Sequence, residues 1–293
     1  MKAIKIKNLT KNYGKNRGIS NINLEINQGE IYGFIGPNGA GKSTTIKTLL
    51  NFLFPTSGSA EILGKDIVGE SKEIKEYTSF VPSEVRYYSE FKVSDILKYA
   101  ASFFNNYDRE YIRELCDELE VELDKKMSEL SLGNKKKVAI VQALINNPKV
   151  VILDEPTNGL DPLIQQKLFN ILLKEKAKGK TIFLSSHNLS EVEKFCDRVA
   201  VIKDGEIVDI LDLKNVNRNL GQRVRLKADN IDIKEIEKLA EEVKVIDKGI
   251  EFIYKGNINE LIALLSKYNL EKLLIEEVKL EDAFMHYYQG EGK

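Results

Sequence analysis

The residues best suited to chemistry form a glycine-rich loop near the start of the chain. Residues 36 to 43 read Gly-Pro-Asn-Gly-Ala-Gly-Lys-Ser and match the pattern G-x-x-x-x-G-K-[ST] without deviation. Glycines let the backbone curl so that successive N–H groups point at phosphate oxygens, and a helix that follows adds its N-terminal dipole. Lys42 is expected to reach the β- and γ-phosphates of a nucleotide, and the Ser43 hydroxyl to bind Mg²⁺. The candidate nucleotide contacts here are Gly36, Pro37, Asn38, Gly39, Ala40, Gly41, Lys42, Ser43 and Thr44.

Two acids at the end of an apolar run are the next candidates. Val150 to Leu153 is continuously apolar and leads directly into Asp154 and Glu155. An aspartate in this position can hold Mg²⁺ directly or through water, and the neighbouring glutamate can polarise the water that attacks a γ-phosphate. A solvated strand end would look the same, but the intact phosphate loop upstream favours a metal and base pair. We therefore predict Asp154 and Ser43 as metal ligands.

The surrounding pattern predicts the elements that carry these residues. The apolar run Ile31 to Ile35 precedes the loop, and a helix of about Lys42 to Leu53 follows it, which is the context that the loop requires. Strands and helices alternate up to Ile210, which predicts a mainly parallel α/β sheet. The segment from about Lys72 to Asn147 is expected to be mostly helical. Asp204-Gly205 between two apolar runs indicates a hairpin.

After about Leu211 the pattern changes. Strand-like and helical segments alternate between Arg223 and Tyr288, which predicts a small α+β domain with its own core. The polar stretch Asn215 to Gly221 would serve as a linker. We expect one domain over residues 1–212 and an accessory α+β domain over residues 213–293. The last expected helix covers Leu280 to Tyr288.

The bulk composition excludes several classes of protein. The 293 residues are 42% hydrophobic and 30% charged, with a formal net charge of −1, which is typical of a soluble globular chain and gives no electrostatic reason to expect nucleic acid as a partner. Apolar stretches fall far short of the ~20 residues that span a bilayer, and the N-terminus lacks a signal-peptide block. Cys116 and Cys196 are the only cysteines, so no disulfide framework is expected and a reducing cytoplasm fits.

Further motifs occur in a characteristic order around these acids. Leu130-Ser131-Leu132-Gly133-Asn134 opens a helix upstream of the apolar run, while Gly159-Leu160-Asp161-Pro162 and Ser185-Ser186-His187 follow it. With this order and spacing, residues from about Lys2 to Ile210 closely resemble the ATP-binding cassette family. The chain looks most like cassettes that pair with separate membrane subunits in bacterial export systems.

The resemblance assigns roles to single residues. Tyr13 matches the aromatic residue that stacks on adenine, although a tyrosine half-buried on a strand edge would look alike. Ser131 and Gly133 match the signature motif, which contacts the γ-phosphate held by a second copy of the cassette. Asp161 matches the acid that signals across the dimer, and His187 the histidine that touches the γ-phosphate. The resemblance thus implies Glu155, His187 and Lys42 as the catalytic set.

Some positions depart from the family pattern. Leu132 replaces a usual glycine, and Asn134 a usual glutamine. Lys135 to Lys137 crowd the start of the signature helix, where cations are unfavourable unless an anion lies nearby, although a solvated face is an equal alternative. Ser83 stands where the family places a glutamine that reaches Mg²⁺. Glu84 either replaces that glutamine or is a solvated loop residue.

The resemblance also implies an architecture and partners. We expect a P-loop NTPase core with an antiparallel β subdomain and a helical subdomain, binding ATP and Mg²⁺ between two copies. The implied partners are membrane subunits on separate chains, with the cassette on the inner face of the cell membrane. A soluble cassette ATPase acting on ribosomes or DNA is the main rival. A P-loop kinase would leave the signature, Asp161 and His187 unexplained. The C-terminal domain would serve dimerisation, regulation or simple capping.

Overall fold

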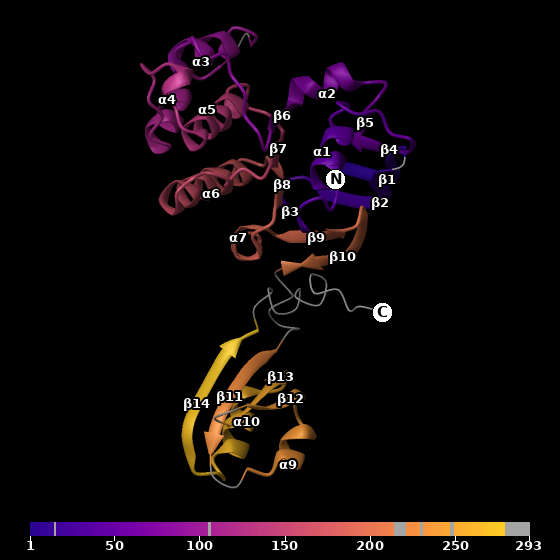
Figure 1. Cartoon of the computed structure of the whole chain (residues 1–293), viewed down its shortest axis with the longest axis vertical. Coiled ribbons are helices and arrows are strands. Elements are labelled where there is room, and N and C mark those ends of the chain that lie inside the picture. Colours follow the sequence, from indigo (N-terminus) through magenta and orange to yellow (C-terminus); the bar gives the residue numbers. More distant parts are fainter. Residues whose placement is uncertain (15, 105–106, 214–220, 229–230, 247–248, 279–293) are drawn as a thin grey trace. The chain divides into compact units, whose positions relative to one another are not determined.

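The structure is a computed structural model that describes residues 1–14, 16–104, 107–213, 221–228, 231–246 and 249–278. The chain divides into two compact units, Met1–Leu211 and Asp212–Lys293 (Figure 1). Among the residues described, no helix is long and apolar enough to span a bilayer. The strands up to Asp212 are β1 (Lys2–Tyr13), β2 (Asn16–Asn27), β3 (Ile31–Ile35), β4 (Ser57–Ile62), β5 (Lys65–Asp66), β6 (Thr78–Val81), β7 (Val150–Asp154), β8 (Thr181–Ser186), β9 (Arg198–Lys203) and β10 (Glu206–Asp212). The helices over the same range are α1 (Lys42–Leu49), α2 (Ser71–Tyr77), α3 (Val93–Ala101), α4 (Arg109–Glu118), α5 (Leu132–Leu144), α6 (Pro162–Ala177) and α7 (Leu189–Phe195).

A six-stranded sheet in the order β10-β9-β3-β8-β7-β6 forms the centre of the first unit. The pairings of β6 with β7, β7 with β8, β8 with β3 and β3 with β9 are parallel, as the alternation of strands and helices predicted. Every residue of β3 and β7 is buried, which explains why both strands are apolar apart from Asp154 at the end of β7. The phosphate loop (residues 36–43) follows β3, and the two acids lie at the end of β7. These strands run parallel with only β8 between them, so the loop and the acids lie at the same edge of the sheet.

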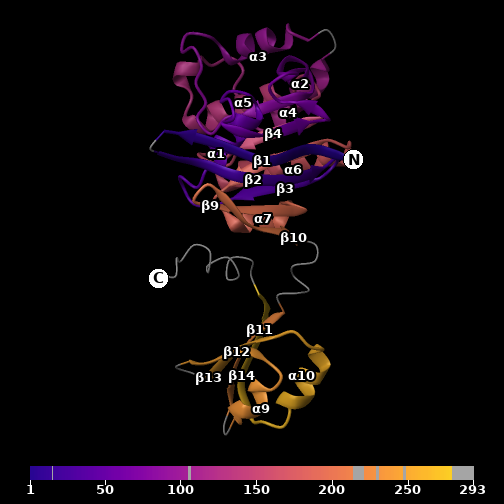
Figure 2. The ribbon, with the colours of Figure 1, turned by 90° about the vertical axis from the view of Figure 1, so that its right-hand side faces the viewer.

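A second, antiparallel sheet in the order β2-β1-β4-β5 packs against helix α1. Figure 2 shows its long strands β1 and β2 facing the viewer. Ile46 and Leu49 of α1 share one buried cluster with Ile6 of this sheet and Ile152 of the parallel sheet. Helix α1 therefore lies between the two sheets. It ends at Leu49 rather than at the predicted Leu53, and Asn51 follows with a left-handed φ of 56°.

Helices α3, α4 and α5 form a helical lobe at the β6 edge of the parallel sheet (Figure 1). The segment from Lys72 to Asn147 is mostly helical, as predicted, but it also contains strand β6 at Thr78–Val81, which the sequence analysis did not identify. A strand of four residues is too short to show a period of its own, and its partner β7 lies far along the chain. After Val81 the chain leaves the sheet and enters the helical lobe.

The second unit is a small α+β fold, as predicted. Its elements are β11 (Gln222–Ala228), α9 (Ile233–Glu237), β12 (Glu241–Ile246), β13 (Gly249–Tyr254), α10 (Ile258–Leu265) and β14 (Leu270–Glu277). The strands pair antiparallel in the order β12-β13-β11-β14. Ile236 and Leu261 from the two helices bury against Val224 and Phe252 of the sheet. The expected linker, Asn215 to Gly221, lies outside the described residues except for Gly221, and the expected helix Leu280–Tyr288 lies wholly outside them.

Candidate nucleotide site

The phosphate loop joins β3 to α1 and is held tightly against its surroundings. Gly41 has a φ of 109°, which favours glycine, and a Cβ there would lie 2.8 Å from the Ile19 side chain. Thr45 N donates to the Gly41 carbonyl and so begins the helix. The first turn of α1 contains no acid. The loop therefore presents backbone N–H groups and a helix N-terminus, which together favour a bound anion.

A cleft of about 240 Å³, which we call the phosphate-loop cleft, opens over this loop. It brings together residues from four separate parts of the chain. Its lining comprises Gly18, Asn38, Gly39, Gly41, Lys42, Ser43, Thr44, Ser83 and Glu155. The sequence-predicted loop, the glutamate that was predicted to be catalytic and the position of the missing glutamine thus share one cleft.

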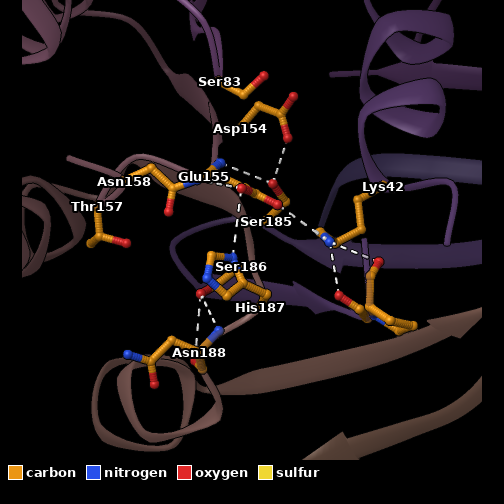
Figure 3. Close-up of polar contacts among 12 residues, drawn as sticks. Lys42, Ser83, Asp154, Glu155, Thr157, Asn158, Ser185, Ser186, His187 and Asn188 are labelled. Atoms are coloured by element: carbon orange, nitrogen blue, oxygen red, sulfur yellow. Dashed lines mark hydrogen bonds and ion pairs between the residues drawn. The ribbon is translucent and has the colours of Figure 1, made fainter. Parts of the chain in front are cut away.

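Asp154 lies at the end of β7 and is fully buried. Its Oδ1 accepts a hydrogen bond of 2.6 Å from the Ser185 hydroxyl, as Figure 3 shows. Its Oδ2 is buried and has no hydrogen-bond partner among the described residues. A buried carboxylate oxygen without a partner is costly in a folded protein. This oxygen therefore suits a metal ion or a metal-bound water, which is the role predicted for Asp154.

Glu155 lies at the centre of the polar contacts in the site (Figure 3). Its Oε1 is 3.3 Å from Lys42 Nζ, and its Oε2 is 3.6 Å from His187 Nδ1. Lys42 Nζ also donates to the Gly36 carbonyl at 2.8 Å. The structure thus brings together the three residues that were predicted to be catalytic. His187 remains half-exposed, whereas Lys42 is buried.

The backbone at Glu155 is unusual, since its φ of 48° is left-handed although it is not a glycine. Such a conformation costs of the order of 1–3 kcal/mol and persists only where the surroundings enforce it. Here the Glu155 N–H donates to the Ser185 carbonyl and hydroxyl oxygens, and the Asn158 amide donates to Glu155 Oε2. These contacts aim the carboxylate into the phosphate-loop cleft.

Glu191 joins the two loops that follow β7 and β8. It accepts hydrogen bonds from the Thr157 hydroxyl at 3.0 Å and from the Ser186 hydroxyl at 3.3 Å. Burial raises the pKa of this carboxyl, while the hydrogen bonds act in the opposite direction. The loop that carries Glu155 is thereby fixed to the loop that carries His187. The sequence carried no signal for this role.

The signature residues lie at the start of α5, as predicted. Ser131 is the N-cap residue, and its hydroxyl accepts from the Asn134 N–H at 3.2 Å. Gly133 packs so closely against the backbone of Gly159 that a Cβ at position 133 would lie 2.2 Å from the Gly159 carbonyl oxygen. Leu132 is 76% exposed. Neither Ser131 nor Gly133 is among the described residues that line the phosphate-loop cleft of the same chain.

Tyr13 and Asp161 occupy different environments. The exposed Tyr13 ring lies beside Gly18, which lines the phosphate-loop cleft, but Tyr13 itself is not among the described residues that line it. Asp161 is the N-cap of α6 and accepts from the Leu163 and Ile164 N–H groups at 3.1 Å. The role of Tyr13 in stacking on adenine and that of Asp161 in signalling across the dimer remain predictions. The capping by Asp161 adds a structural role that the sequence analysis did not consider.

Ser83 and Glu84 differ in their relation to the site. Ser83 lines the phosphate-loop cleft, whereas the Glu84 side chain is 80% exposed and pairs with Arg86 at 3.0 Å. This geometry favours the interpretation of Glu84 as a solvated loop residue. The functional group that sequence reasoning missed here is Lys136, whose ammonium donates to the Ser83 carbonyl at 2.6 Å.

Comparison with known proteins agrees with this geometry. The family model described as ABC transporter matches residues 19–158. A model described as AAA domain, putative AbiEii toxin, Type IV TA system matches residues 125–193. The bacitracin transport ATP-binding protein of Bacillus licheniformis is 33% identical over 98% of this chain and 97% of its own length. The chain belongs to the ATP-binding subunits of ABC transporters. It is accordingly a P-loop ATPase.

Other relatives of this ABC subunit extend the comparison. The lantibiotic transport ATP-binding protein of Streptococcus pyogenes is 38% identical over 70% of this chain and 89% of its own length. A solved ATP-binding cassette in a dimeric, post-hydrolysis state with ADP and phosphate is 28% identical, with a TM-score of 0.65, over 72% of this chain and 98% of its own. The share of this chain that the solved cassette covers is about as large as the first unit, Met1–Leu211.

Proposed function

We propose that two copies of this ABC subunit pair to form two shared ATP sites. Each site combines the phosphate loop of one copy with Ser131 and Gly133 of the other. The observation that carries the proposal is the start of α5, where Ser131 caps the helix and neither Ser131 nor Gly133 is among the described residues that line the phosphate-loop cleft of the same chain. A helix N-terminus favours an anion such as a γ-phosphate. A related cassette has been solved as a dimer, which supports the same arrangement.

Asp154 and Ser43 fit a Mg²⁺ ion bound with ATP. The buried, partnerless Oδ2 of Asp154 and the Ser43 hydroxyl in the cleft supply hard oxygen ligands. Mg²⁺ in such sites neutralises the charge of the β- and γ-phosphates. Asp154 itself is oriented by the Ser185 hydroxyl, so its free oxygen keeps one direction.

Glu155 would act as the general base toward the attacking water. In the structure its carboxylate is held by Lys42, His187 and Asn158. When Lys42 turns to the β- and γ-phosphates, Oε1 is released from its ion pair and can accept a proton from water. His187 and the partner's Ser131 would then contact the γ-phosphate. Tyr13 would stack on the adenine, and Asp161 would report the state of one site to the other.

Closure of the dimer would act on membrane subunits carried by separate chains. A hollow of about 460 Å³ between β6, α3 and α5 offers a docking surface with an aromatic rim. The exposed rings of Tyr99 and Phe103 pack edge to face at 4.9 Å beside it, and exposed aromatic residues often mark protein contacts. Relatives include the Nod factor export ATP-binding protein of Burkholderia orbicola. We therefore propose export as the direction and the cytoplasmic face of the membrane as the location.

Substitution of the base tests this function directly. Glu155→Gln keeps the size of the side chain but removes the proton acceptor, so hydrolysis should fall by about 10²- to 10⁴-fold while ATP binding persists. The variant should also accumulate as an ATP-bound dimer in gel filtration. Near-normal turnover by Glu155→Gln would place the base elsewhere.

A further inference from the structure

A buried lysine on the signature helix contacts the chain where it leaves the parallel sheet. Lys136 of α5 is only 3% exposed. Its Nζ donates to the Pro82 carbonyl at 2.8 Å and to the Ser83 carbonyl at 2.6 Å. These two residues directly follow the last residue of β6. The lysine therefore joins the helical lobe to the segment that connects it with the sheet.

The cost of this arrangement indicates a specific use. A buried ammonium loses its hydration, and its hydrogen-bond partners here are neutral carbonyl groups rather than a carboxylate. Burial lowers the pKa of Lys136, and the negative charges of Asp154 and Glu155 oppose that shift. The cation thus lies within electrostatic reach of both acids of the site. An apolar side chain could fill the same space without this cost.

Ser83 is the point at which this contact reaches the ATP site. It lines the phosphate-loop cleft together with Lys42 and Glu155. On its other side it lines a hollow of about 390 Å³ together with Lys136 and Gly159. The segment of Ser83 is therefore held between the cleft and the signature helix. Ser83 itself has a short side chain, so the connection to α5 is made through its backbone carbonyl.

We propose that Lys136 is the positioning residue that couples the helical lobe to the ATP site of the same chain. By holding the Pro82 and Ser83 carbonyls, it makes the cleft wall at Ser83 move with α5. Glu84 does not serve this purpose, since its carboxylate is exposed and paired with Arg86. The inference rests on the proposed hydrolysis at this cleft and adds the connection through which signature contacts affect it.

The neighbouring lysine provides a matched control. Lys137 is also buried on α5, but its Nζ donates to the Glu120 carbonyl at 3.1 Å, within the helical lobe. Steady-state ATPase kinetics, metal-free ATP binding and thermal unfolding are measured for the full-length parent, Lys136→Met and Lys137→Met. Lys136→Met is expected to lower kcat by about 10- to 100-fold, because small displacements of a site slow the reaction strongly. KM and metal-free ATP affinity should stay within about twofold, since the phosphate loop is untouched.

Lys136→Arg should restore kcat to within about threefold of the parent, because a guanidinium can also donate to two carbonyls. Lys137→Met should keep kcat within about twofold, whatever its effect on thermal stability. Equal loss of kcat in both Met variants, or parent-like kcat in Lys136→Met, would overturn the coupling role. If Lys136→Met does not fold, Lys136→Gln takes its place: its shorter side chain cannot span both carbonyls, and parent-like turnover would contradict the inference. A parent without hydrolysis would contradict the proposed function itself.

Discussion

Gly133 offers a test of how closely the signature segment must pack. A Cβ at this position would lie 2.2 Å from the Gly159 carbonyl oxygen, whereas real contacts of this kind are essentially never shorter than 3.0 Å. In Gly133→Ala the two backbone segments must therefore separate by at least about 0.8 Å. Overpacking of this kind typically costs about 1–3 kcal/mol of folding free energy. The clash is with backbone, so side-chain rotation cannot relieve it.

Gly133→Ala should also slow ATP hydrolysis. The start of α5 and the segment of Gly159 both belong to the proposed shared site, and a displacement near 1 Å can slow a reaction by about 10²-fold. We expect kcat/KM for ATP hydrolysis to fall by that order, while ATP binding to the isolated chain changes little. Binding is measured by equilibrium titration and stability by urea unfolding. Gly69→Ala is the control, because a Cβ at Gly69 would lie 3.5 Å from its nearest neighbour, an ordinary van der Waals contact, and Gly69 lies outside the proposed shared site. Parent-like hydrolysis by Gly133→Ala would refute the reasoning.

Two further predictions concern stability and domain organisation. Glu175 is fully buried and accepts hydrogen bonds from Lys178, Lys180 and Tyr111; burial raises its pKa, but these bonds outweigh burial and leave the pKa lowered. Glu175→Gln leaves Lys180 without its charged partner and should cost about 3–5 kcal/mol in urea unfolding at neutral pH. The lowered pKa of the Glu175 carboxyl stabilises the fold at pH values above about 4, which is the ordinary pKa of a carboxyl group. This stabilisation is lost as the pH falls through the lowered pKa, so the difference in unfolding free energy between the parent and Glu175→Gln should shrink in acid. A difference that does not change with pH would contradict this. We also propose residues 1–212 and 213–293 as separate domains, so a chain ending at Asp212 should stay soluble and bind ATP, whereas its aggregation would indicate a shared core.

Local sequence determined much of the site in advance. The phosphate loop could be predicted because its chemistry lies in eight consecutive residues between a strand and a helix. Asp154 and Glu155 were predictable for the same reason, since both end one buried strand. Ser131 and His187 were assigned only through the family resemblance, which depends on the order and spacing of several motifs.

The parts that could not be predicted depend on contacts between distant segments. Lys136 meets the Pro82 and Ser83 carbonyls across more than fifty residues, and in the sequence it is simply one of three consecutive lysines. Strand β6 is defined by its pairing with β7 rather than by its own pattern. The left-handed backbone at Glu155 likewise results from Ser185, which lies on the next strand of the sheet. None of these contacts between distant segments can be predicted from the order of residues along the chain.

Mixing two inactive variants tests the shared site most directly. Lys42→Ala removes the phosphate contact of one half-site, and Ser131→Arg blocks the signature of the other. In a mixed dimer one site then pairs an intact loop with an intact signature. With equal amounts of the two chains, about half of the dimers are mixed and each has one working site, so about a quarter of the parent ATPase activity should return. No recovery, although mixed dimers are demonstrated by differently tagged chains, would contradict the shared site.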